Sequence, residues 1–340
     1  MILKTLLYML IFSFFTSLFA NGAVVFMYHR FDESKYPSTS ITTKQFQYQL
    51  DYLEKNNYNV WHISKILRYI KAKKPIPPKT VALTIDDAYI SVYKKAYPLL
   101  KKKNFPFSVM VNTNPVDNKS ESYMSWDMMR EMKANKAEFA NHSQSHDYLT
   151  HKKNETDEAF KKRLTKEVLN AQLRLQEELG EDTNENPKLF VYPFGEFSIK
   201  SAEFLKELDY IGVTQTSGAV GESSDLMSIR RFPMSETFAT KDGFKTKLNT
   251  LPMPIDYLSP FEPTLKEENP PKLLIKLKRP LKNLKCYMSS GEPIPIKWFS
   301  DTEFIISANR TLKKPREKYT CTAPAPNKKW YWYSHLWIIK

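Results

Sequence analysis

The segment VALTIDDAY, residues 81–89, places two carboxylates directly after a short apolar run. The run is aliphatic and partly β-branched, and its length suits a buried strand. Asp86 and Asp87 would then stand at the carboxyl end of that strand, where enzymes built on parallel sheets concentrate their chemistry. Two such acids can divide labour, one binding a cation and the other acting as a base. Capping of a following helix by aspartate is the alternative that this segment leaves open.

Similar apolar runs recur before and after this segment, at residues 24–28, 105–111, 137–140, 189–193 and 211–214. The stretches between them have helical character. Apolar residues repeat at Phe46, Leu50 and Leu53, and a long helical pattern ends on Gly180, which suits a helix C-cap. Strands separated by helices predict an α/β fold with parallel pairing, either a barrel or a doubly wound sheet.

The pentapeptide HSQSH places two of the chain's six histidines, His142 and His146, directly after the run at 137–140. Histidines at i and i+4 can face one metal ion if the segment coils into a turn. Exposed polar histidines are the alternative. Together with one aspartate the pair makes three ligands, which leaves open positions for water and substrate, as a catalytic zinc site requires.

These motifs in combination resemble the polysaccharide deacetylases with the NodB homology domain, carbohydrate esterase family 4. TIDD at 84–87 is similar to the first motif of that family, HSQSH at 142–146 to the second, and YPFGEF at 192–197 to the third. SWDMMREM at 125–132 resembles the segment that often precedes the second motif. The resemblance covers roughly residues 24–240 and implies a distorted (β/α) barrel of the NodB type.

The resemblance also implies a role for each matching residue. Asp86 would be the general base, while Asp87, His142 and His146 would hold a divalent metal. We expect zinc, although cobalt, nickel and iron accept the same ligands. The tetrahedral oxyanion would be held by the metal and by the backbone N–H of Phe194.

Two departures from the family pattern concern the general acid and the residue that orients the base. The usual late L-x-H motif is missing, and the tail holds His335 instead. The early segment VVFMYHRFD is similar to that of exported poly-β-1,6-N-acetylglucosamine deacetylases, which implies His29 as the acid. Val191 stands where the third motif often has arginine, so the orienting residue is open, and we consider Arg230 or Arg231 near the rim of the site.

Aromatic residues beside the motifs could contact a sugar. We expect Trp126, Tyr192 and Phe194 to bind substrate, because flat rings suit the apolar faces of pyranoses, and we expect Pro193, which lies between the last two, to bind substrate as well. Packing in the core is the alternative for each ring.

The pattern breaks in a proline-rich stretch at 250–271, which predicts a domain boundary. We expect a NodB-like polysaccharide deacetylase domain at 23–260 and a small β-rich domain at 268–340. Cys286 and Cys321 are the only cysteines, and in an exported chain they predict one disulfide. Two buried free thiols remain the alternative.

The first 22 residues carry one lysine, an apolar run at 5–19 and small residues after it. This pattern predicts a secretory signal peptide at 1–22 and a periplasmic, extracellular or cell-surface protein. An uncleaved anchor is the alternative. No later stretch is apolar enough to span a bilayer.

The net charge is +14, and residues 261–340 hold 16 Lys and Arg against 7 Asp and Glu. Such a surface attracts anionic partners, or only aids solubility, and we expect no nucleic acid for an exported chain. In the tail, alternation places Trp330 and Trp332 on one strand face, either as a glycan platform or buried against the first domain.

The predicted function is metal-dependent hydrolytic N-deacetylation of an extracellular N-acetylhexosamine polysaccharide, with poly-β-1,6-N-acetylglucosamine as the leading substrate. One alternative is a peptidoglycan N-acetylglucosamine deacetylase. Another is a non-catalytic glycan-binding or assembly protein that retains the fold.

Overall fold

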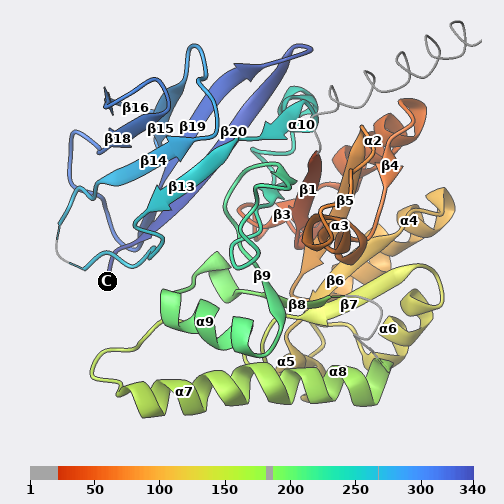
Figure 1. The fold of residues 1–340 in the computed structure, drawn as a ribbon. Helices are drawn as coiled ribbons and strands as arrows, with labels where there is room; N and C mark the ends of the chain where they lie inside the picture. The colour runs from red at the N-terminus through yellow and green to blue at the C-terminus, as the bar shows by residue number, and fades with distance from the viewer. Residues whose placement is uncertain (1–21, 181–186, 267) are drawn as a thin grey trace, which may run out of the picture.

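The computed structural model describes residues 22–180, 187–266 and 268–340 (Figure 1). The predicted signal peptide, apart from Gly22, lies outside the described residues. Within the described ranges, the structure contains no helix whose length and hydropathy would allow it to cross a membrane.

A curled sheet of parallel strands forms the centre of the first part of the chain. Its strand order is β10-β1-β5-β6-β7-β8-β9, with β11 beside β1 and β4 beside β5. Only the β1–β10 pair is antiparallel among the pairs described in this sheet. The α/β class predicted from the alternating pattern is confirmed. The strands are β1 (Gly22–Tyr28), β4 (Asn59–Val60), β5 (Thr80–Asp86), β6 (Phe107–Val111), β7 (Ala137–Asn141), β8 (Lys188–Val191), β9 (Tyr210–Val213), β10 (Val220–Gly221) and β11 (Phe232–Pro233).

Both faces of this sheet are buried, which explains why its strands are continuously apolar. In β5, Val81, Leu83 and Ile85 pack into one hydrophobic cluster, whereas Ala82 packs into another. Side chains alternate between the faces of a strand, so a strand covered on both faces shows no polar alternation. The small parallel pair β2 (Arg30–Phe31) and β3 (Ser40–Ile41) lies after β1.

Helices connect the parallel strands, and their ends follow local capping rules. α2 begins at a capping box between Thr42 and Gln45, and α8 ends at Gly180 in the left-handed conformation, as the sequence predicts. α7, η2 and α8 run on as one long helical segment at the bottom of Figure 1. The helical elements are α2 (Thr43–Lys55), α3 (Ile63–Lys71), η1 (Val92–Ala96), α4 (Tyr97–Lys103), α5 (Thr113–Asp117), α6 (Trp126–Lys133), α7 (Asp157–Thr165), η2 (Lys166–Asn170), α8 (Ala171–Leu179), η3 (Pro193–Gly195), α9 (Ile199–Glu207) and α10 (Lys241–Leu248).

Two antiparallel-rich sheets follow, and they share one hydrophobic core. We call them the C-terminal sheets. Cys286 and Cys321 are register partners on β15 and β19 and form a disulfide. Because β12 and β13 belong to these sheets, the C-terminal sheets begin at Thr250, within the proline-rich stretch at 250–271. The strands are β12 (Thr250–Pro252), β13 (Ile255–Ser259), β14 (Leu273–Leu277), β15 (Lys285–Met288), β16 (Pro293–Ile294), β17 (Ile296–Trp298), β18 (Glu303–Ile306), β19 (Arg316–Ala325) and β20 (Lys329–Ile338).

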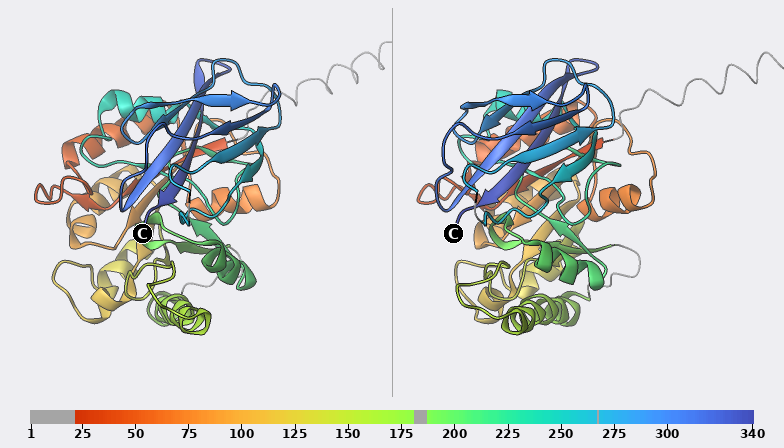
Figure 2. Two further views of the ribbon diagram at one scale, coloured as in Figure 1. Left: turned by 90° about the vertical axis from the view of Figure 1, so that its left-hand side faces the viewer. Right: turned by 60° about the vertical axis from the view of Figure 1, so that its left-hand side comes forward.

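The C-terminal sheets pack directly against the central sheet, as the two views of Figure 2 show. β20 pairs in parallel with β12, and Trp332 of β20 makes an edge contact with Phe232 of β11 at 5.5 Å between ring centroids. Trp330 lies two residues earlier and is 43% exposed. The two tryptophans therefore differ: Trp332 joins the two parts of the molecule, and Trp330 reaches solvent.

Candidate active site

Strand β5 delivers the two carboxylates to one edge of the central sheet. Asp86 is its last residue and is 0% exposed, and Asp87 follows it with 6% exposure. Asp87 has a positive φ of 73°, a conformation that non-glycine residues seldom adopt outside constrained sites. This turn in the backbone lets two adjacent side chains serve one site.

Asp87, His142 and His146 form a cluster of potential metal ligands. The Nε2 atoms of His142 and His146 each lie 3.3 Å from Asp87 Oδ1. One ligand atom from each residue lies within 4.8 Å of the other two. The predicted grouping of these three residues therefore holds in space, and the group can bind a metal ion.

The hydrogen bonds around this cluster fit a cation. His142 Nδ1 donates to the carbonyl of Val191 at 2.7 Å, which turns Nε2 toward Asp87 Oδ1. His142 Nε2 and Asp87 Oδ1 are buried without hydrogen-bond partners among the described residues. Burial and the neighbouring His142 lower the pKa of His146 to about 4, so the His146 ring is neutral at pH 7. Three lone-pair donors converge, as a divalent metal requires.

The loop after β7 is held in the tight turn that brings both histidines together. Ser143 N–H donates to Asn141 Oδ1, and His146 N–H donates to Ser143 Oγ. Ser145 donates to the buried carboxylate of Glu167 from both its N–H and its hydroxyl. The two imidazole centroids are consequently 4.8 Å apart.

Arg231 holds the carboxylate of Asp86 through a buried bidentate ion pair. Its Nη1 and Nη2 donate to the two carboxylate oxygens at 2.6 and 2.8 Å, and both side chains are fully buried. Further bonds to Thr84 Oγ1 and the Thr214 carbonyl fix the guanidinium. Burial alone would raise the pKa of Asp86, but Arg231 outweighs it and keeps the carboxyl charged. The prediction that Arg231 lies near the rim of the site is therefore wrong, because its side chain is fully buried against the Asp86 carboxylate.

His29 follows β1 and approaches Asp86 from the other side. Its Nε2 lies 3.8 Å from Asp86 Oδ2, and its side chain is 13% exposed. His29 also lines a cavity of about 960 Å³ between the central sheet and the C-terminal sheets, which we call the inter-sheet cleft. The residues that line it include His29, Phe194, Gln215, Phe232, Lys318 and Trp332.

The third motif contributes a strained turn at the mouth of this site. Phe194 has a φ of 59°, and its ring contacts His146 at 4.5 Å and stacks on Tyr148 at 4.3 Å. Phe194 is partly exposed to the inter-sheet cleft, whereas Tyr192 and Pro193 are buried. Tyr192 donates its hydroxyl to the Met227 carbonyl within a hydrophobic cluster, so its ring is a core residue and has no face for a sugar.

Trp126 lies at the start of α6 and does not line the inter-sheet cleft. Its indole N–H donates to Asp117 at 2.9 Å, and the Arg174 guanidinium lies over its ring. These contacts tie α5, α6 and α8 together. Its position therefore gives the substrate-binding role predicted for Trp126 no support.

Comparison with known proteins agrees with this geometry. Residues 73–213, which contain Asp86, Asp87, His142, His146 and the YPFGEF segment, match the family described as polysaccharide deacetylase. A segment of less than half of the chain therefore matches the polysaccharide deacetylase family. The predicted family resemblance is thereby confirmed, and so is assignment to a family of deacetylase enzymes.

Relatives of this deacetylase domain share modest identity with it. The poly-beta-1,6-N-acetyl-D-glucosamine N-deacetylase of Escherichia coli (strain K12) is 24% identical over 259 residues, which cover 65% of this chain and 38% of that protein. The enzyme of the same description from Staphylococcus aureus (strain MSSA476) is 26% identical over 183 residues, covering 52% of this chain and 61% of that one. The chain thus spans about two fifths of the length of the Escherichia coli relative.

Solved structures show the same fold for the deacetylase domain. IcaB from Ammonifex degensii aligns with a TM-score of 0.56 and 26% identity, covering 66% of this chain and 96% of that one. The Streptococcus pyogenes deacetylase PplD aligns with a TM-score of 0.59 and 22% identity, covering 68% of this chain and 99% of that one. These similarities confirm the predicted NodB-type fold of the central sheet.

Proposed function

We propose that the protein is a metal-dependent N-deacetylase that hydrolyses N-acetyl groups of poly-β-1,6-N-acetylglucosamine. The observation that carries this proposal is the Asp87–His142–His146 cluster beside a buried carboxylate, Asp86, that Arg231 keeps charged. Two relatives described as poly-beta-1,6-N-acetyl-D-glucosamine N-deacetylases support the choice of polymer.

Each side chain of the site has a distinct task in this reaction. Asp86 accepts a proton from the attacking water, because its fixed carboxylate borders the three-ligand cluster. A divalent cation on Asp87, His142 and His146, for which we propose zinc, would lower the pKa of water and polarise the amide carbonyl.

The tetrahedral intermediate is stabilised by a hydrogen-bond donor to its oxyanion. Its breakdown requires an acid that protonates the leaving amine. The Gly195 and Glu196 amides donate to the carbonyls of Tyr192 and Pro193, which leaves the Phe194 N–H for the oxyanion. His29 is 3.8 Å from Asp86 and reaches the inter-sheet cleft, so we assign it the protonation of the amine. The products are acetate and a polymer with a free amine.

The proposal extends to domain organisation and location. We assign catalysis to the deacetylase domain, predicted at residues 23–260, and a separate contribution to the C-terminal sheets. The apolar N-terminal segment supports export of the chain, and its polymeric substrate lies outside the cytoplasm. The basic charge of residues 261–340 suits contact with an anionic cell surface.

Acetate release tests the proposal directly. Purified protein is incubated with poly-β-1,6-N-acetylglucosamine oligomers or peptidoglycan fragments, before and after chelation and zinc reloading. We expect chelator-sensitive release from the β-1,6 oligomers, and loss of release in Asp86→Asn, His142→Ala and His29→Ala. His62→Ala is the matched control, because His62 does not line the inter-sheet cleft and bonds to the Lys136 carbonyl instead.

The substrates and variants separate the alternatives. Release from peptidoglycan alone would move the substrate to cell-wall glycan. No release from either substrate by protein that still binds zinc would contradict the enzymatic proposal and favour a glycan-binding protein.

A further inference from the structure

The inter-sheet cleft continues from the proposed site into the space between the two parts of the molecule. One wall comes from the central sheet and its connections, including His29, Phe194 and Gln215. The opposite wall comes from β19 and β20, including Lys318 and Trp332. At about 960 Å³ the cleft is at the upper end of the usual range for ligand sites, so it has room for more than the reacting sugar.

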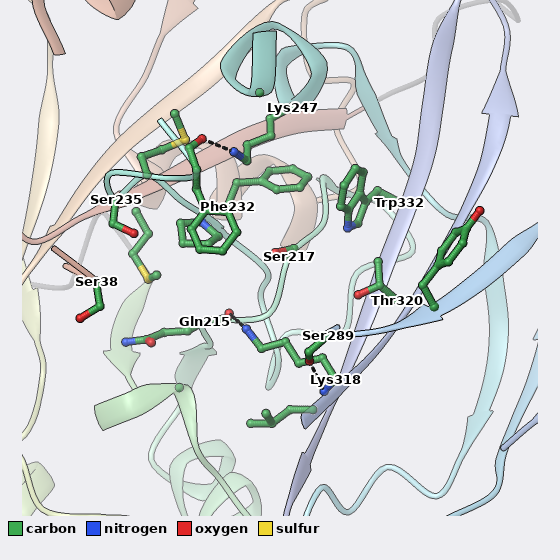
Figure 3. Close-up of a pocket in the computed structure, with 18 of the residues that line it drawn as sticks. Ser38, Gln215, Ser217, Phe232, Ser235, Lys247, Ser289, Lys318, Thr320 and Trp332 are labelled. Atoms are coloured by element: carbon green, nitrogen blue, oxygen red, sulfur yellow. Dashed lines mark hydrogen bonds between the residues drawn. The ribbon is translucent and has the colours of Figure 1, made fainter. Parts of the chain in front are cut away.

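The lining of the cleft suits carbohydrate. Trp330 and Trp332 present aromatic surface, with the buried Phe232 packed behind Trp332, and serine and threonine hydroxyls line the same cleft (Figure 3). The indole nitrogen of Trp332 is buried and has no hydrogen-bond partner among the described residues. A buried donor of this kind gains from an acceptor, and the hydroxyl and acetamido oxygens of a sugar supply one.

The charge of the cleft is one-sided. Its lining contains Lys247, Arg316 and Lys318 but no aspartate or glutamate. Arg316 is neutralised by Glu196 at 3.0 Å.

Neither lysine has a carboxylate partner among the described residues. The Lys247 Nζ donates to the Phe238 carbonyl, and the Lys318 Nζ donates to the Gln215 carbonyl at 2.9 Å. Figure 3 shows the two lysines on opposite sides of Phe232. Burial, with the nearby Arg316 in the case of Lys318, lowers the pKa of each lysine to about 8, which leaves both mostly charged at pH 7.

A one-sided positive field distinguishes the substrate of a deacetylase from its product. An N-acetylated sugar is neutral, whereas the sugar left after hydrolysis carries an ammonium group. Each lysine Nζ donates one hydrogen bond to a backbone carbonyl and keeps its positive charge, which repels a cationic sugar, whereas a neutral sugar meets no such repulsion.

We propose that the inter-sheet cleft binds the sugar units that flank the reacting one, and that Lys247 and Lys318 admit those units only while they are N-acetylated. This inference rests on the proposed function. Its consequence is that each hydrolysis makes the neighbouring positions poorer substrates. The enzyme therefore produces separated free amines and does not advance along adjacent sugars.

Binding of defined oligomers tests this selectivity apart from catalysis. The full chain, treated with chelator, is titrated with a fully N-acetylated β-1,6-linked hexamer and with hexamers that carry two free amines. Titrations are run at pH 6 in low salt and in 0.5 M salt, and mass spectrometry verifies that the hexamers stay intact. We expect the acetylated hexamer to bind about tenfold more tightly in low salt, and this ratio to shrink in high salt.

Charge variants assign the effect to the two lysines. Lys247→Gln and Lys318→Gln each keep a donor for the backbone carbonyl, and the double variant should reduce the ratio to about threefold or less. Lys245→Gln is the matched control, because Lys245 is on the same helix but contacts Tyr52 outside the cleft. Its ratio should equal that of the wild type.

Several results would overturn the inference. They are equal binding of the two hexamers, no binding of either, or an unchanged ratio in the double variant. Acetate release by the metal-loaded protein is measured in parallel. If acetate is released but the two hexamers bind equally, only the inference about the cleft is contradicted. If the hexamers bind unequally but no acetate is released, only the proposed catalysis is contradicted.

Discussion

Arg231→Met should destabilise the fold and abolish the proposed base function together. The substitution removes two short charged hydrogen bonds to Asp86 and leaves that carboxylate fully buried without its counter-ion. Breaking one partner of a buried ion pair costs about 3–5 kcal/mol of unfolding free energy. That is a large share of the about 5–15 kcal/mol that stabilises an ordinary domain, so reduced expression is expected as well.

A double-mutant cycle measures the pair itself. Urea unfolding is compared among the wild type, Arg231→Met, Asp86→Asn and the double variant. Because the double variant leaves no unpaired buried charge, its loss should be smaller than the sum of the two single losses by more than about 1 kcal/mol. Arg231→Lys supplies a milder change, since lysine keeps the charge but cannot donate to both oxygens in a fixed fork.

Catalysis should follow the geometry of the carboxylate. With protein of verified zinc content, we expect acetate release to fall by about 10²-fold or more in Arg231→Met and by less in Arg231→Lys. Arg230→Gln is the matched control, since Arg230 contacts Tyr333 and the Ser334 carbonyl and leaves Asp86 untouched. Additive unfolding losses, or full activity in soluble Arg231→Met, would refute an orienting role.

Three further predictions concern the C-terminal sheets. Arg316→Ala should lower kcat about tenfold with little change in KM, because Arg316 donates to the Phe194 carbonyl at 2.9 Å and holds the proposed oxyanion turn. The zinc content of the variant is measured as the control. An unchanged kcat would contradict the prediction. Burial, with Arg230 nearby, lowers the pKa of His335 to about 3, so below pH 6.5 only the unfolded state gains its proton. Wild-type stability should therefore fall by about 1 kcal/mol per pH unit more steeply than that of His335→Gln between pH 6 and 4, as measured by urea unfolding. Replacing both Cys286 and Cys321 with alanine should lower the free energy of unfolding by about 4 kcal/mol, because the disulfide no longer restricts the unfolded chain. An unchanged midpoint of urea unfolding would contradict this prediction.

The sequence predicts the central sheet well because its strands are buried on both faces. Runs such as 81–85 and 105–111 are short and almost continuously apolar, which is the pattern of a strand buried on both faces, and β5 ends at Asp86 as this pattern indicates. The metal-ligand cluster was also predictable, because each ligand sits directly after a strand, at Asp87 or in HSQSH, and parallel strands bring these ends to one edge.

The environment of the site was not predictable in the same way. Arg231 reaches Asp86 across 145 positions of sequence, and no spacing rule links them. The two adjacent arginines in SIRRFPM do not show which of them is buried. The apolar residues on either side of the pair are the one feature of the sequence that points to burial. The surroundings of Tyr192 and Trp126 were not predictable for a related reason, since an aromatic residue beside a motif can equally pack against other parts of the protein.

The pairing of β20 with β12 has a consequence for how the protein is made. Trp330 and Trp332 leave the ribosome after every residue against which they pack, including Thr250 and Phe232. A nascent chain can thus complete the three-ligand cluster while one wall of the cleft is still missing, and the apolar edge that Trp332 will cover stays open to chaperones or to other chains. The wall that carries Trp332, and with it the proposed selection among sugars, is therefore the last part of the cleft to be synthesised.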